Sequence, residues 1–167
     1  MARPSPSAAL VAVFAAVCGE PARSAVARAA QRRDFVPVPL ASLREEEAAG
    51  AVFPEDAEAW RGTGEVAGAL LFWDATASSC EMRAQGVDPV VVEAEFAKLP
   101  QALEEAGSSV MRLPPPPAQA GAPRTRQMLL VSPGGSSRPE RARVLRLADA
   151  VGRDAVALSA RGVAAAR

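Results

Sequence analysis

The chain has 167 residues, of which 49% are hydrophobic and 23% are charged, a composition that excludes a disordered chain and fits one globular domain over residues 1–167. The 19 basic and 19 acidic residues balance, so no overall charge favours binding to nucleic acid or to an anionic membrane. The chain contains no histidine, which removes the commonest general base and the commonest metal ligand, and we expect neither a metal nor a cofactor.

Residues 1–19 contain an apolar run, Ala8–Val17, that has three interpretations. It resembles the core of a secretory signal peptide with a cleavage point near Gly19, and the arginine-rich sequence that follows also fits an organellar presequence. It is too short to span a bilayer, which takes about 20 apolar residues. We prefer a buried parallel strand, because such strands are continuous apolar runs. The strand implies a cytoplasmic protein, whereas either leader implies a secreted or organellar one.

The next segments indicate a helix, a strand and a second helix. Pro21 opens a predicted helix over residues 20–33. An extended segment, Phe35–Leu40, contains two prolines that exclude a central strand, so it is either an edge strand or a polyproline-II-like segment. Ser42 and Glu45 form a capping box for a helical stretch over residues 42–61.

A second buried strand is predicted over residues 66–74, and the two candidate catalytic side chains follow it. Asp74 ends this strand and could act as acid, base or metal ligand, while Cys80 is a candidate nucleophile that no histidine can activate. Cys18 and Cys80 could form a disulfide only if the fold brings their Cα atoms within about 7 Å. Two well-separated cysteines are more typical of free, partly buried thiols.

A helix and a strand precede the clearest break in the sequence. Asp88 and Pro89 have the residue types of an N-cap and a first helical position, and Pro100 should kink or split the helix that they begin. A strand is expected over residues 109–113. Residues 114–126 form a proline-rich linker within the domain, because too few residues follow it to bury a core of their own.

The last unit is a strand over residues 127–132, a turn, a helix to about residue 152 and a strand over residues 155–158. The turn is the candidate ligand site, because its glycines, hydroxyls, helix N-terminal amides and arginine could bind a phosphate or carboxylate group. Its residues are Gly134, Gly135, Ser136, Ser137 and Arg138. The flanking Pro133 and Pro139 remove two amides, so an ordinary helix start also explains the turn.

These units predict an α/β fold. We expect a small three-layer sandwich with a mostly parallel sheet, built from three βαβ-like units and Rossmann-like or flavodoxin-like in outline. Residues 18–42 can be laid over residues 135–160, which indicates either a duplication or a shared architecture. The crevice beyond the strand ends would then bring together the loops at residues 18–20, 74–80 and 132–138.

The sequence favours a non-catalytic α/β binding or structural domain that acts as a subunit or accessory of a larger protein assembly. The alternative is a small enzyme or binding protein for a phosphorylated or carboxylate ligand held at the Gly134–Arg138 turn. Protein partners are expected, whereas nucleic acid and a transmembrane span in the mature chain are not.

Overall fold

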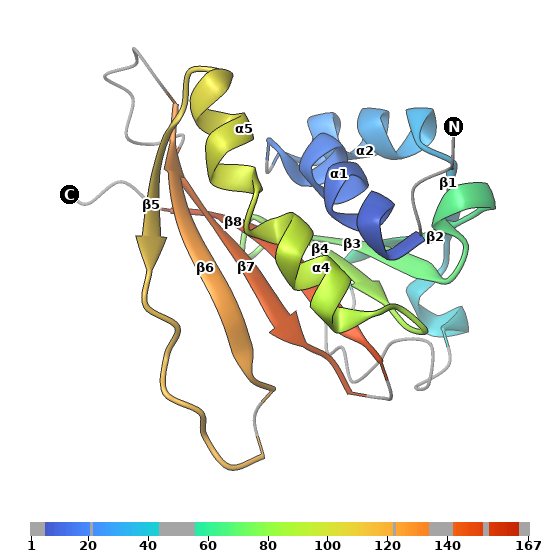
Figure 1. The fold of residues 1–167 in the computed structure, drawn as a ribbon. Helices are drawn as coiled ribbons and strands as arrows, with labels where there is room; N and C mark the ends of the chain where they lie inside the picture. Colours follow the sequence, from blue (N-terminus) through green and yellow to red (C-terminus); the bar gives the residue numbers. More distant parts are fainter. Residues whose placement is uncertain are drawn as a thin grey trace, which may run out of the picture.

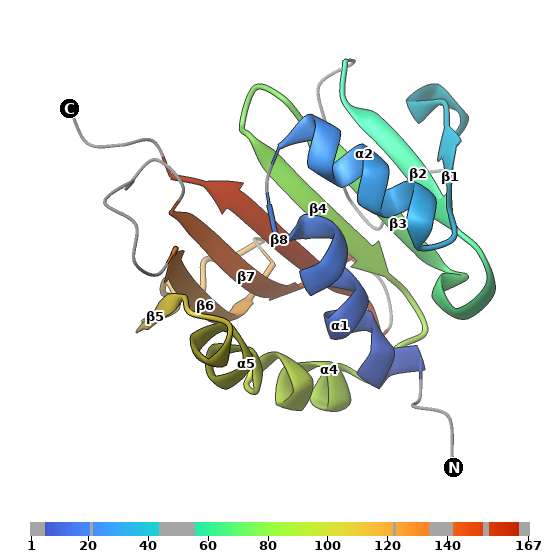
Figure 2. The ribbon, with the colours of Figure 1, turned by 90° about the horizontal axis from the view of Figure 1, so that it is seen from above.

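The protein is an eight-stranded antiparallel sheet with helices on one face. The computed structural model describes residues 6–20, 22–43, 56–121, 123–133, 142–151 and 154–163. In this part of the chain the strand order is β1–β2–β3–β4–β8–β7–β6–β5, and each neighbouring pair is antiparallel. The described α-helices lie over one face of the sheet, and the opposite face carries none of them (Figure 1, Figure 2).

The helices are α1 (Pro6–Cys18), α2 (Arg23–Arg32), α4 (Pro89–Phe96) and α5 (Leu99–Glu105), with short 3₁₀ turns at Leu40–Ser42 (η1) and Gly64–Val66 (η2). The strands of the first half are β1 (Phe35–Val38), β2 (Glu58–Gly62), β3 (Ala69–Asp74) and β4 (Ser79–Ala84). Those of the second half are β5 (Ser109–Leu113), β6 (Thr125–Ser132), β7 (Arg143–Asp149) and β8 (Val156–Gly162).

The predicted three-layer sandwich with a mostly parallel sheet is wrong. Parallel strands need a crossover connection of a dozen or more residues, whereas only residues 75–78 join β3 to β4. Such a short connection produces an antiparallel hairpin. The result is a two-layer fold, with one helical layer on one side of one sheet (Figure 2).

The chain folds as two halves with the same order of elements. In each half, two helices precede a meander of four strands: α1, α2 and β1–β4, then α4, α5 and β5–β8. The two meanders meet where β4 pairs antiparallel with β8. An approximate two-fold axis through this pair therefore relates the two halves. The overlay of residues 18–42 on 135–160 is wrong, because the first range contains α2 where the second contains β7.

The predicted strand at Ala8–Val17 is the helix α1. Its buried side chains, Leu10, Val11, Phe14 and Val17, recur at helical spacing and face the core. Alanines fill most other positions, and alanine has the highest helix propensity. In the described chain, no helix is long and apolar enough to cross a membrane.

Three further elements differ from the sequence-based expectation. The predicted helix over 42–61 ends as β2, and its residues 44–55 lie outside the described residues. The predicted last helix contains β7, in which Leu145 and Leu147 alternate toward the core. The predicted loop before Cys80 is a turn that leads into β4, where polar residues alternate with the buried Cys80, Met82 and Ala84. This alternation is the signature of a half-buried strand.

Several local predictions are confirmed. The proline-containing segment at Phe35 is an edge strand, and the strands expected near residues 66–74, 109–113, 127–132 and 155–158 are present as β3, β5, β6 and β8. Asp88 caps α4, because its side chain accepts a hydrogen bond from the backbone N–H of Val90 at 3.0 Å. The helix that follows is split into α4 and α5, with Pro100 in the first turn of α5.

The main core lies between the helical layer and the sheet. It contains Phe14 of α1, a helix that packs on β4 and β8, and Phe96 of α4, a helix that packs on β6, and both side chains are fully buried. Leu71, Met82 and Leu158 contribute the apolar surface of β3, β4 and β8 and are also fully buried. A smaller cluster on the opposite face contains Ala59, Leu70 and Phe72.

Candidate anion-binding site

The structure describes only some of the residues of the sequence-based site hypothesis. The candidate ligand turn, Gly134 to Arg138, lies outside the described residues. Asp74 and Cys80, the candidate catalytic residues, are both described, and each has a structural partner.

Asp74 stabilises the turn between β3 and β4. Its Oδ1 accepts hydrogen bonds from the backbone N–H groups of Thr76 at 3.0 Å and Ala77 at 3.3 Å. An aspartate that binds the backbone two and three residues ahead is typical of an Asx turn. Ser78 completes this turn with a positive φ of 47°. The carboxylate thus helps the chain to reverse direction between the two strands.

Cys80 forms a disulfide with Cys18, with a Cα–Cα distance of 5.5 Å. The expectation that both cysteines are free is therefore wrong, and neither supplies a thiolate. The bond joins the last residue of α1 to the second residue of β4. Of the three loops expected to meet, it brings together those at residues 18–20 and 74–80. The third loop lies mostly outside the described residues.

A cluster of arginines on α2 lines a polar pocket. The buried face of α2 consists of Val26 and Ala30, which pack into the core. Arg28 and Arg32 are four residues apart and so project on the same side of this helix. Ala25 and Ala29 lie beside them, and their small side chains leave the space between α2 and α1 unfilled.

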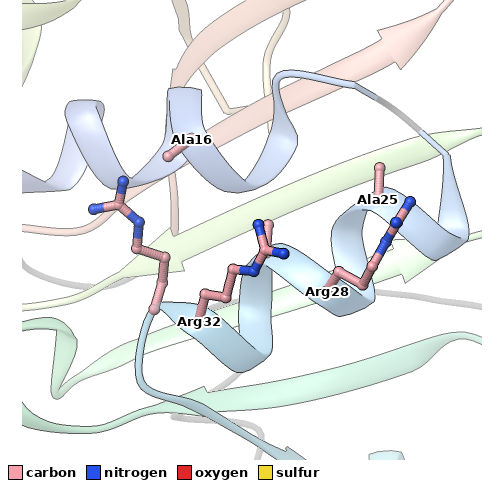
Figure 3. Close-up of a pocket in the computed structure, with 6 residues that line it drawn as sticks. Ala16, Ala25, Arg28 and Arg32 are labelled. Atoms are coloured by element: carbon pink, nitrogen blue, oxygen red, sulfur yellow. The ribbon is translucent and has the colours of Figure 1, made fainter.

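This pocket has a volume of about 310 Å³ and is lined by six residues from α1, α2 and the end of α2. They are Ala16, Ala25, Arg28, Ala29, Arg32 and Arg33. Figure 3 shows Arg28 and Arg32 rising from separate points along α2, with Ala16 on the neighbouring helix α1. The lining therefore combines a small apolar floor with three guanidinium groups.

The charge of this pocket is not neutralised by any described carboxylate. Arg28 donates a hydrogen bond from Nε to the carbonyl oxygen of Ser24 at 3.3 Å, which leaves its two terminal nitrogens available. The structure shows no ion pair from Arg32 or Arg33 to another described residue. Three cations without a counter-ion among the described residues create a local positive potential in a chain of zero net charge.

Two other described arginines, Arg23 and Arg126, differ from these three because carboxylates bind them. Arg23, also on α2, binds Glu58 of β2 through Nε at 2.8 Å and Nη2 at 2.9 Å, and this hydrogen bonding raises the pKa of Arg23. Arg126 binds both Asp149 and Glu93. The α1–α2 pocket therefore holds guanidinium groups that the fold does not use for such ion pairs.

A second hollow of about 730 Å³ lies on the other side of α2, against β1 and β2. Its walls are mainly apolar and include Phe35, Pro37 and Trp60. Glu58 is the one acidic residue among them, and Arg23 binds its carboxylate. This hollow offers an apolar surface but no arginine, so it is a weaker candidate for recognition of a charged ligand.

The sequence alone indicates one of the two walls of the arginine pocket. The predicted helix over 20–33 already separates Arg28 and Arg32 from its apolar face. The other wall is α1, which was predicted to be a strand, so the space between two helices could not be anticipated. Comparison with protein-family models, with curated proteins and with solved structures finds no match.

Proposed function

We propose that the protein is a non-catalytic binding domain that holds a phosphate or carboxylate group of a small ligand in the α1–α2 pocket. The observation that carries the proposal is that Arg28, Arg32 and Arg33 line one pocket and that none of them pairs with a described carboxylate. A guanidinium presents several N–H donors in a planar fork, which matches the oxygens of carboxylate and phosphate groups.

The size of the pocket supports a small ligand. Its volume of about 310 Å³ is at the lower end of the range for small-molecule sites. One charged group with a short organic substituent would therefore fit. The position of Arg32 in the last turn of α2 is favourable for a cation, and an anion bound there would depend on the side chains rather than on backbone amides.

A binding role is favoured over catalysis by the partners of the two candidate catalytic residues. The carboxylate of Asp74 is bound to the backbone of its own turn, and the sulfur of Cys80 is bound to Cys18. The alternative of a small enzyme would need a different set of reactive side chains. Membership of a larger assembly remains a prediction from the sequence.

The proposal is tested by thermal unfolding and calorimetric titration with inorganic phosphate, pyrophosphate and citrate, against sodium chloride at equal ionic strength. Ligands that bind only the native state raise Tm, and the increase grows with the logarithm of the ligand concentration once this exceeds Kd. We expect the polyvalent anions to raise the Tm of the native protein. The Arg28→Ala/Arg32→Ala variant should remain folded, because both side chains are exposed, and should lose this increase.

Arg23→Ala is the matched control, because Arg23 is on the same helix but is paired with Glu58. This variant should retain the response to anions even if its Tm without ligand is lower. An equal loss of the response in both variants would indicate general attraction to a basic helix and would contradict a specific pocket. The absence of any Tm shift or heat of binding in the native protein would contradict the proposal outright.

A further inference from the structure

The two edges of the sheet differ in their capacity to accept another strand. At one edge, β1 contains Pro37 and is followed by Pro39, and a proline has no backbone N–H to donate. At the other edge, β5 runs from Ser109 to Leu113 without a proline, so each of its residues retains an N–H. Among the described strands, β5 pairs only with β6. Its outer edge is therefore a template for a further strand.

The geometry of β5 is suited to such pairing. It pairs with β6 over its whole length, from Ser109 opposite Ser132 to Leu113 opposite Met128, with no shift of register. The strand is therefore regular and lacks the bulge that protects many edges. Met111, at its centre, is an exposed large hydrophobic side chain, with 60% of its surface accessible.

We propose that the outer edge of β5 pairs antiparallel with β5 of a second copy of this chain, with Met111 at the two-fold axis. In this register Met111 faces Met111 of the other copy, Val110 faces Arg112, and Ser109 faces Leu113. The pairing is isologous, which means that both copies use the same edge of β5. The unpaired backbone N–H and C=O groups of each β5 are then bound by the β5 of the other copy. This pairing would join the sheets of the two copies into one continuous antiparallel sheet. The antiparallel pairing of β4 with β8 joins the two halves of each chain in a similar way.

The charges on β5 allow this arrangement. Arg112 is the one charged residue of the strand, and the register places it opposite Val110 instead of opposite another arginine. Its Nη2 also donates a hydrogen bond to the carbonyl oxygen of Ala97 at 3.3 Å, which directs the guanidinium back toward its own helical layer. With equal numbers of acidic and basic residues, two copies carry no net charge that would repel. Pro114 ends the paired segment.

Cysteine cross-linking tests the register directly. Cys18 and Cys80 are joined in a disulfide, so a Met111→Cys substitution introduces the one free thiol of the chain. Directly opposed residues of antiparallel strands have Cβ atoms about 5 Å apart, close enough for a disulfide. We expect mild oxidation to convert most of the Met111→Cys variant into a covalent dimer. The matched control is Val36→Cys, because Val36 lies on the other edge strand and is 51% exposed.

Sedimentation velocity over a range of concentrations provides the second measurement. The native protein should show a monomer–dimer equilibrium, and Met111→Lys should weaken the dimer by about tenfold, because two like charges would face each other across the axis. Val36→Lys should leave the equilibrium unchanged. Circular dichroism establishes that each variant is folded.

A native protein that remains monomeric at all concentrations would overturn the proposal. Equal cross-linking of the Met111→Cys and Val36→Cys variants would also overturn it, since this indicates random collision. A dimer that Met111→Lys does not weaken would place the interface elsewhere. Loss of phosphate binding in the separate arginine variants has no bearing on these outcomes, because α2 and β5 lie at opposite sides of the molecule (Figure 2).

Discussion

Arg126 shows how single side chains connect the helical layer to the sheet. It lies at a bulge in β6, where the register with β7 shifts between Thr125 and Gln127. Its Nε binds Asp149 of β7 at 2.6 Å, and its Nη1 binds Glu93 of α4 at 2.8 Å. The hydrogen bond to Asp149, followed by that to Glu93, raises the pKa of Arg126. The bulge therefore turns an arginine toward two carboxylates from different elements.

Replacement of this side chain should have a measurable effect on stability. Arg126→Gln removes both charge-assisted hydrogen bonds, and we expect the free energy of unfolding to fall by about 1–2 kcal/mol, since the partners are partly exposed to solvent. Urea denaturation measures the change. Lys98→Gln is the control, because the Lys98–Glu95 pair is exposed and should contribute less than about 0.5 kcal/mol. Equal changes in the two variants would contradict a special role for the Arg126 network.

At the scale of residues, the sequence predicts local contacts and misses distant ones. Asp88 could be predicted as an N-cap because its partner, Val90, is two residues away. The pocket around Arg28 could not be predicted, because Ala16 and Arg28 meet only when α1 and α2 pack together. The Cys18–Cys80 disulfide is a similar case, since its partners are 62 residues apart. Contacts of this kind depend on the fold, not on local sequence patterns.

At the scale of elements, α1 is held in the structure by both packing and a covalent bond. Phe14 and Val17 are buried in the main core, and the disulfide fixes the end of the helix to β4. The interpretation of this segment as a removable leader predicts a mature chain without these contacts. In the structure α1 is one wall of the arginine pocket and a neighbour of α2 and α4. Removal of the segment as a leader stays a prediction from the sequence.

Removal of the disulfide should lower stability substantially. The two cysteines are separated by 62 residues, and closure of a loop of this length in the unfolded chain is worth about 4 kcal/mol in the chain-entropy description. We expect Cys18→Ala/Cys80→Ala to have a markedly lower Tm in thermal unfolding. Addition of a reductant should lower the Tm of the native protein in the same direction and leave that of the double variant unchanged. Detection of two free thiols in the unreduced, unfolded protein would contradict the disulfide.

The elements that the sequence misassigned share one physical property: their local patterns permit more than one structure. In β7, Val144, Leu147 and Ala148 fit a helical stripe, while Leu145 and Leu147 fit a strand. Pairing with β6 and β8 on both sides decides in favour of the strand. The alternation in β4 is visible in the sequence, but the loop predicted over residues 74–80 includes only the first two residues of this strand. Strand identity here depends on neighbours that are distant in the chain.

At the scale of the whole molecule, the two halves meet in one continuous sheet instead of two separate domains. β4 and β8 pair over six positions, from Ser79 opposite Arg161 to Ala84 opposite Val156. Each half contributes its last strand to this central pair. Buried residues of both halves, such as Met82 and Leu158, therefore belong to one shared core. The sequence predicted a mixture of helices and strands but not this topology, because hairpin pairing and the central junction are set by contacts between distant segments.

The position of a strand in this sheet should determine how slowly its backbone amides exchange with solvent. At the centre, Met82 of β4 faces Leu158 of β8, and both are fully buried. β1 and β5 have a described partner on one side only. Exchange of central amides requires extensive unfolding, whereas edge amides exchange through local opening. We expect β4 and β8 to be protected longest and β1 and β5 least, as measured by hydrogen–deuterium exchange at concentrations that favour the monomer. Faster exchange in β4 than in β1 would contradict a central position for the junction of the two halves.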